Sequence, residues 1–241
     1  MIPESIVYDG TTYTVVAIAS EAFYECDQVT SISIPKTIKY IGRNAFYGCE
    51  GLHSVYISDL TSWCNISFTR NEYSNPLTYA HQLLLNNEPL LDLEIPNDVT
   101  TIGQYTFCNV DFNSIKIENN VEINSNAFYN VNVNSVSVGN NVNDINSEAF
   151  YNCSTSYLSI NCPEIGRWVR GMSPKEVKVG KDVERIRGAA FDNCTSLVVV
   201  TMEDGITEIG PEAFFYCDSL LYVEIPNSVK YIGRKAFEGC I

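Results

Sequence analysis

The residues with the greatest chemical potential in this chain are its cysteines, which number nine against only two histidines. Thiols can act as nucleophiles, form disulfides or bind metal ions, depending on their spacing and surroundings. Six of them follow a phenylalanine by three residues, at Cys26, Cys49, Cys153, Cys194, Cys217 and Cys240. Two copies of the same pattern carry Val110 and Val131 instead. A position that accepts either valine or cysteine is small and apolar, so the sequence predicts a stack of buried free thiols.

Other uses of these residues fit the spacing less well. Parallel Cβ vectors in stacked repeats oppose disulfides between adjacent copies, and the sequence contains no CxxC pair for a metal. His53 and His81 lie outside any nucleophile or metal motif. Glu203 and Asp204 are neighbours in a loop, with nothing nearby to raise a carboxyl pKa. We therefore expect no catalytic residue, no metal, no cofactor and no enzymatic activity.

The cysteine pattern belongs to a longer repeat, LxxVxIPxxVxxIGxxAFxxC, which is clearest at residues 220–240. The phenylalanines of its AF pair are Phe23, Phe46, Phe107, Phe128, Phe150, Phe191, Phe214 and Phe237. The common interval is about 23 residues, and the two long intervals each hide a degenerate copy with inserted residues. A fixed period of this length is typical of a solenoid. We expect about ten turns of about 23 residues.

Each part of the repeat predicts an element. The alternating VxI segment is typical of a short strand, and the proline after it ends the strand's hydrogen bonding. The glycine of the IG pair turns the chain, and AFxxC predicts a tight helical or 3₁₀ turn that buries the phenylalanine. Stacked copies align their strands in parallel. The sequence thus predicts one β-rich solenoid domain over 1–241, with an irregular insertion at about 58–89 and an irregular turn at about 161–175.

Composition limits the partners. The formal net charge of −14 repels nucleic acid phosphates and anionic lipid surfaces. No stretch is long and apolar enough for direct membrane insertion, and the first residues lack the basic region and apolar core of a signal peptide. The last residue follows the repeat cysteine Cys240 directly. We therefore expect the sequence to be a piece of a longer array or to lack its cap.

The AFxxC and VxIPxxVxxIG strings resemble those of the BspA-type leucine-rich repeat family, over essentially the whole chain. The resemblance implies a leucine-rich-repeat solenoid that is extracellular or at the cell surface. Proteins of this kind are mostly exported bacterial surface proteins, also abundant in some parasitic protists, and are associated with adhesion and protein binding. Residues 58–89 are similar to an insertion of bacterial members, with Trp63 near the IG position and a hairpin leading back into the array.

Side chains that flank the inward residues of each strand must face solvent, which predicts a binding surface. Its residues are Ser33, Tyr56, Glu94, Lys116, Tyr157, Lys178, Thr201, Tyr222 and Glu224. The exposed tyrosines have the amphipathic character of recognition hot spots. Small residues and isolated aromatics also simply suit an exposed parallel sheet.

Two functions follow from these features. The first is a non-catalytic recognition or adhesion module that presents the sheet to proteins or glycans, such as those of a host extracellular matrix or mucosal surface. The second is a structural stalk that spaces another domain from the cell surface and has no ligand of its own. Substitutions in the outward row should abolish binding by a recognition module, whereas a stalk should tolerate them and respond only to changes in length.

Overall fold

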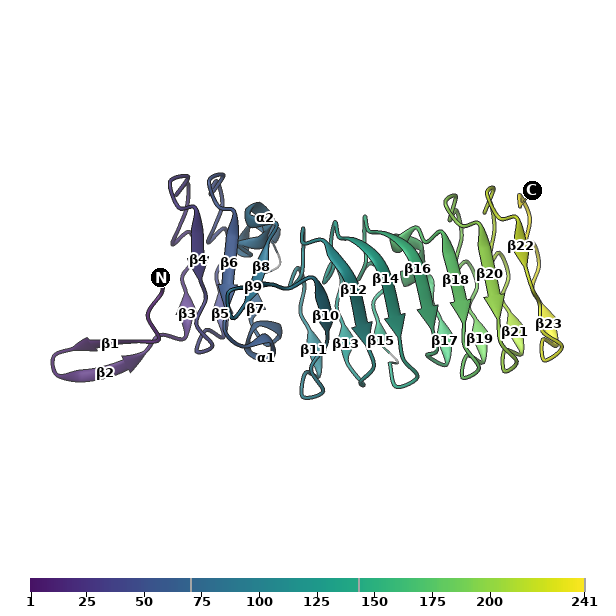
Figure 1. Cartoon of the computed structure of the whole chain (residues 1–241), viewed down its shortest axis with the longest axis horizontal. Coiled ribbons are helices and arrows are strands. Elements are labelled where there is room, and N and C mark those ends of the chain that lie inside the picture. The colour runs from purple at the N-terminus through teal and green to yellow at the C-terminus, as the bar shows by residue number, and fades with distance from the viewer. Residues whose placement is uncertain (70, 143, 241) are drawn as a thin grey trace.

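The computed structural model describes residues 1–69, 71–142 and 144–240. It is an elongated solenoid of about ten turns, stacked along the horizontal axis of Figure 1. We call each turn of the solenoid a rung. A typical rung consists of a longer strand, a two-residue strand and a tight turn around the motif phenylalanine. Because each rung repeats this order, the equivalent strands of neighbouring rungs pair in parallel. The predicted β-rich solenoid is therefore confirmed.

The longer strands of the last seven rungs form the main sheet. Its alternating pattern is clear in the register, where the buried residues Ile115, Val136 and Leu158 lie opposite one another. Apolar residues at every second position point inward and stabilise the stack by burial, at roughly 25 cal/mol per Å². The strands are β10 (Asp92–Glu94), β12 (Phe112–Ile117), β14 (Asn132–Val138), β16 (Ser154–Ile160), β18 (Glu176–Val179), β20 (Val199–Met202) and β22 (Tyr222–Val223).

A separate N-terminal sheet precedes the main sheet. It contains β4 (Ser31–Ser33), β6 (Ser54–Ile57), β8 (Leu83–Leu85) and β9 (Glu88–Pro89). Strands β8 and β9 pair in antiparallel fashion, which confirms the predicted hairpin within the insertion. Strand β9 ends this sheet and does not pair with β10, so the longer strands form two separate sheets. The chain crosses from β9 to β10 between them (Figure 1).

The two-residue strands form three narrow sheets. They are β3 (Ala17–Ile18), β5 (Tyr40–Ile41) and β7 (Ser67–Phe68); β11 (Thr101–Ile102), β13 (Glu122–Ile123) and β15 (Asp144–Ile145); and β17 (Glu164–Ile165), β19 (Arg185–Ile186), β21 (Glu208–Ile209) and β23 (Tyr231–Ile232). Most of these strands contain the isoleucine of the IG pair or its equivalent.

The insertion departs from the prediction at Trp63. Ile41 of the IG pair lies opposite Phe68, so Phe68 and not Trp63 fills the equivalent position in this rung. Trp63 is buried on α1 (Leu60–Cys64), where its indole N–H donates to the carbonyl of Thr106, 3.2 Å away. The insertion also contains the 3₁₀ helix η1 (Glu72–Ser74) and α2 (Leu77–Ala80).

A second hairpin lies near the first residues. It consists of β1 (Ser5–Tyr8) and β2 (Thr11–Thr14), joined by Asp9 and Gly10 in left-handed conformations. This hairpin extends from the array in Figure 1, and its apolar side chains are exposed.

The phenylalanine turns, which contain the AFxxC residues, combine two kinds of hydrogen bond. Alternate amides bond within the turn in the predicted 3₁₀ manner, such as the N–H of Cys108 to the carbonyl of Tyr105. The other amides donate to the next rung, as the N–H of Phe107 does to the carbonyl of Ala127 at 2.9 Å. Left-handed residues such as Tyr105 and Asn109 separate these bonds and prevent a continuous helix. We call the bonds between rungs the turn-side ladder.

The motif phenylalanines stack face to face inside the solenoid. Ring centroids are 5.4 Å apart for Phe107 and Phe128 and 4.7 Å apart for Phe128 and Phe150. The stack is interrupted in the next rung, where Trp168 on the 3₁₀ helix η2 (Arg167–Met172) packs at 45° to Phe150. This irregular rung corresponds to the predicted turn near 161–175. Another stack, from Phe191 to Phe237, then continues the array.

The cysteine positions also stack as predicted. Cys49, Cys153, Cys194 and Cys217 are buried, whereas Cys26 and Cys240 are partly buried, and all nine cysteines are free. Several thiols donate to the carbonyl of the motif phenylalanine in the preceding rung, as Cys153 does to Phe128 at 2.7 Å. Burial raises the pKa of Cys153 and of Cys194 to about 12. These thiols are held protonated and are poor nucleophiles.

Candidate recognition surface

The outward side chains of the main sheet form two parallel rows. Lys116 lies opposite Ser137, which lies opposite Ser159, and Ser159 lies opposite Lys178. Tyr157 belongs to the second row, between Ser135 and Glu176. The rows follow from the period of two along each strand and from the parallel register, which repeats the same position in every rung.

All nine residues of the predicted surface are exposed or half-buried. Six lie on strands of the main sheet: Glu94, Lys116, Tyr157, Lys178, Thr201 and Tyr222. Glu224 follows β22 directly and accepts a hydrogen bond from the Tyr222 hydroxyl at 3.3 Å.

The remaining two residues, Ser33 and Tyr56, lie opposite each other on the N-terminal sheet. The structure therefore does not bring the three tyrosines of the hot-spot prediction together. Tyr56 is on a different sheet, and two strands separate Tyr157 from Tyr222. The role of these residues in binding stays a prediction.

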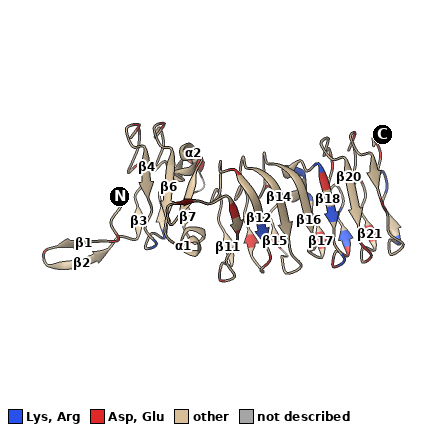
Figure 2. Ribbon diagram, in the orientation of Figure 1, with Lys and Arg blue, Asp and Glu red and all other residues tan. Residues whose placement is uncertain are grey.

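Charged side chains on the main sheet pair across strands. Lys116 lies 3.2 Å from Glu94, and Lys178 lies 2.8 Å from Glu203. The hydrogen bond between Lys178 and Glu203 raises the pKa of the lysine and lowers the pKa of the glutamate. Both side chains are exposed, so water screens their attraction. Acidic and basic residues alternate here, and β18 carries both signs in Figure 2.

The main sheet is hollowed where β14, β16 and β18 end. This sheet hollow has a volume of about 430 Å³, and Ser137, Ser159, Lys178 and Glu203 are among its lining residues. A volume of this size lies within the usual range for small-ligand sites. The hollow thus joins the predicted outward row to a concave polar site.

Loop residues beyond the strand ends fix one side of the sheet hollow. Asn161 donates to the carboxylate of Asp182 at 2.6 Å, and the N–H of Asp182 donates back to the Asn161 side chain at 3.1 Å. Gly180 makes room for this pair, because a Cβ there would lie 2.2 Å from Oδ1 of Asn161. The sequence does contain a signal for this site: the proline that follows other strands is replaced by Gly139, Asn161 and Gly180.

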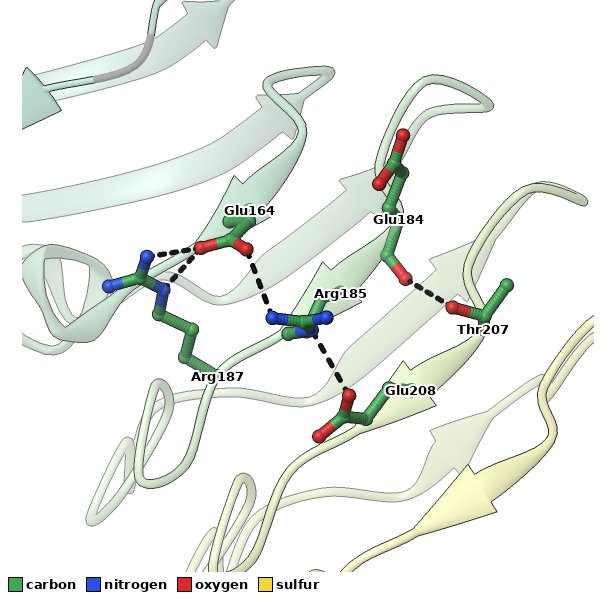
Figure 3. Close-up of polar contacts among 6 residues, drawn as sticks. All are labelled: Glu164, Glu184, Arg185, Arg187, Thr207 and Glu208. Atoms are coloured by element: carbon green, nitrogen blue, oxygen red, sulfur yellow. Dashed lines mark hydrogen bonds and ion pairs between the residues drawn. The ribbon is translucent and has the colours of Figure 1, made fainter.

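The last narrow sheet carries a different polar cluster (Figure 3). Glu164 accepts hydrogen bonds from Arg187 and also from Arg185 at 3.2 Å, and Arg185 reaches Glu208 at 3.0 Å. Nearby, the Thr207 hydroxyl donates to the main-chain carbonyl of Glu184. Each of these charged side chains except that of Glu184 already has an opposite charge across the strands. The cluster therefore ties β17, β19 and β21 together.

Neither of the two histidines is among the residues that line the sheet hollow. Nδ1 of His81 is 3.0 Å from the carbonyl oxygen of Asn109, and the His53 side chain is exposed. Within residues 1–69, 71–142 and 144–240, no three histidine, cysteine or acidic side chains are grouped so that they could hold a metal ion.

Over the same described part of the chain, none of the helices has the length and apolar character needed to cross a bilayer.

Comparisons with known proteins agree with this repeat pattern. A family model described as the BspA type leucine rich repeat region, with six copies, matches residues 10–84, 80–169 and 168–241. A search of curated proteins finds no significant match.

Several solved structures are similar over nearly the whole chain. A leucine-rich repeat protein from Eubacterium ventriosum has 16% identity and a TM-score of 0.55, over 94% of this chain and 81% of that one. A leucine-rich repeat protein from Bacteroides ovatus has 22% identity and a TM-score of 0.41, over 100% and 84%. A leucine rich cell surface protein from Faecalibacterium prausnitzii has 21% identity and a TM-score of 0.38, over 99% and 78%. At these identities the similarity concerns the fold alone. The evidence for the shared fold is the Eubacterium protein, because its TM-score is the highest of the three.

Proposed function

Because the chain belongs to the BspA-type leucine-rich repeat family, we propose that it is a recognition module of a cell-surface protein. Its ligands would be extracellular proteins or glycans, and the main sheet would be the binding surface. The family resemblance supports the extracellular setting. The charge of −14 agrees with a partner that is neither nucleic acid nor an anionic lipid surface.

The observation that carries the proposal is the sheet hollow within the outward row. Its lining includes the hydroxyl groups of Ser137 and Ser159 and the ammonium group of Lys178, which parallel strands supply. Loop residues add another lysine and two glutamates. Side chains held on strands of a packed solenoid are fixed relative to one another, so binding costs little conformational entropy. A concave site with a few converging polar groups is a better docking place than the flat strand surface around it.

The test uses the purified chain and an array of extracellular matrix proteins, mucins and glycans. The double substitution Ser137→Tyr and Ser159→Tyr fills the sheet hollow with side chains that suit an exposed strand. We expect a ligand captured by the unchanged chain to lose at least about tenfold in affinity in this variant, because it can no longer enter. The substitution Thr100→Tyr, on an exposed residue outside the main sheet, is the matched control and should leave affinity unchanged.

A second variant separates the sheet hollow from the tyrosine hypothesis. Alanine at Tyr56, Tyr157 and Tyr222 removes the predicted hot spots but leaves the hollow open. Loss of binding only in this variant would show that the tyrosines, and not the sheet hollow, form the binding site. Equal binding by all variants would refute recognition through the outward row, and capture of no component would favour the stalk.

A further inference from the structure

The turn side of the solenoid contains a second cavity, which shares no lining residue with the sheet hollow. It has a volume of about 570 Å³ and lies beside η2, the helix that replaces the phenylalanine turn in the irregular rung. Tyr151, Asn152, Arg167, Arg170 and Ser173 are among its lining residues. We call it the turn-side pocket.

The pocket is built by the change of local structure in the irregular rung. Gly171 of η2 approaches the preceding rung so closely that a Cβ there would lie 2.5 Å from the carbonyl oxygen of Phe150. The carbonyl of Gly171 also accepts a hydrogen bond from the N–H of Cys153 at 2.9 Å. The helix η2 is therefore fixed against the preceding rung, and the pocket lies between tightly packed elements.

One wall of the turn-side pocket is an aromatic ring with a free face. Tyr151 stacks on Tyr129 with ring centroids 6.1 Å apart, and the rung that follows Tyr151 supplies an arginine-bearing helix instead of another tyrosine. By contrast, Tyr47 has aromatic neighbours at 5.0 and 5.1 Å on its two sides. Accordingly Tyr151 is 57% exposed and Tyr47 only 37%. A ligand ring can take the place of the missing aromatic neighbour.

The second feature of the pocket is an arginine without an acidic partner. Arg170 pairs with Asp192 at 3.3 Å, and Glu148, which also lines the pocket, accepts a hydrogen bond from the Ser125 hydroxyl at 3.0 Å. Arg167 is exposed, and no side chain in the described residues forms an ion pair with it. A guanidinium group binds a carboxylate through two parallel hydrogen bonds, and here it is free to do so.

From this juxtaposition we propose that the turn-side pocket binds a carboxylated sugar. The sugar ring packs on the free face of Tyr151, its carboxylate pairs with Arg167, and its hydroxyl groups bond to Asn152 and Ser173. A pocket of this volume holds one or two sugar units. The site is separate from the sheet hollow and does not depend on it.

The experiment uses saturation-transfer NMR to detect binding of D-glucuronate and a titration to measure its dissociation constant. D-glucose is the uncharged counterpart. We expect D-glucuronate to bind at one site and D-glucose to bind at least about tenfold more weakly, because only the first can pair with Arg167. Arg167→Ala should weaken D-glucuronate binding by about the same factor. Tyr151→Ala should remove the transfer to the sugar ring protons, with circular dichroism confirming that the variant is folded.

The chain supplies a matched control in Arg43. It follows Gly42 as Arg167 follows Gly166, and it is also exposed, but its rung has the usual phenylalanine turn. Arg43→Ala removes the same charge and should leave D-glucuronate binding unchanged. The sheet-hollow variant Ser137→Tyr with Ser159→Tyr should also bind D-glucuronate normally, so failure of one site is distinguishable from failure of the other.

The proposal would be overturned by no binding of D-glucuronate, by equal binding of D-glucose, or by an Arg167→Ala variant that binds as well as the unchanged chain. Equal weakening by Arg43→Ala would do the same, because it would show that the sugar responds only to net charge.

Discussion

The buried thiol of Cys153 should make the protein less stable at alkaline pH, and valine at this position should remove that effect. The pKa of Cys153 is raised by burial from 9.0 to about 12. The unfolded chain therefore releases this proton at a lower pH than the folded chain does. The stabilisation is fully present below about pH 9 and is lost as pH rises towards the folded pKa of about 12.

The magnitude follows from the two pKa values. Between about pH 8 and about pH 10.5, this one thiol should lower the free energy of unfolding by about 2 kcal/mol. Cys153→Val also loses the thiol hydrogen bond to Phe128, at a cost of about 1 kcal/mol at any pH. Valine fits because the two preceding motif copies carry Val110 and Val131 in this position. The variant should thus be the less stable protein at about pH 8 and the more stable one at about pH 10.5.

Urea unfolding of both proteins at the two pH values, in the presence of a phosphine reductant, measures this difference. Tyrosine and lysine titrations are common to both chains and cancel in the comparison. The reciprocal variant Val131→Cys is the control, since a thiol introduced into the same kind of buried position should add a similar alkaline loss. If the Cys153→Val and unchanged proteins lose stability in parallel between the two pH values, the thiol is not held protonated and the reasoning is wrong.

Two further predictions concern the phenylalanine turns. Phe214→Ala should lower the free energy of unfolding by about 4 to 6 kcal/mol, because Phe214 is fully buried and stacks on Phe191 and Phe237. Urea unfolding measures this, and a loss no larger than that of Phe237→Ala, which removes a half-buried ring with one stacking neighbour, would contradict it. Ala189→Gly should raise the thermal midpoint through about 1 kcal/mol of added stability, because Ala189 has a φ of 55° and its Cβ strains the left-handed backbone. Calorimetry that finds the glycine variant less stable would refute this strain.

Much of the fold follows from the repeat because one pattern fixes the same element in every rung. The VxI alternation predicted the strands of the main sheet, and the choice between valine and cysteine at one position predicted the buried thiols. These features depend on local periodicity and on side-chain volume, which the sequence states directly.

The irregular parts were harder to predict because they depend on packing between distant residues. Trp63 was assigned to the IG position, but Phe68 occupies it, since the indole reaches the carbonyl of Thr106 in another rung. The antiparallel strand β9 divides the predicted surface into two sheets, which a repeat frame alone does not reveal.

The candidate sites were predicted only in part. Lys178 was expected on the outward row, but its partner Glu203 and the pair of Asn161 and Asp182 lie beyond the strand ends. The irregular turn at about 161–175 was expected, yet the position of its Arg167 beside Tyr151 depends on the close approach of η2 to the preceding rung.

The hydrogen bonds of the turn-side ladder give one side of the solenoid an electrical polarity along its axis. Phe23, Phe107 and Phe191 each donate from one rung to an alanine carbonyl of the next, and Phe128 and Phe214 repeat the same direction. Their peptide dipoles of about 3.5 D therefore add head to tail, as they do in an α-helix. The positive direction of this field points towards higher residue numbers. At the narrow sheets the bonds run the other way, as the N–H of Gly42 donates to the carbonyl of Ile18 and that of Gly210 to the carbonyl of Ile186. The axial dipoles on these two sides of the solenoid therefore oppose each other.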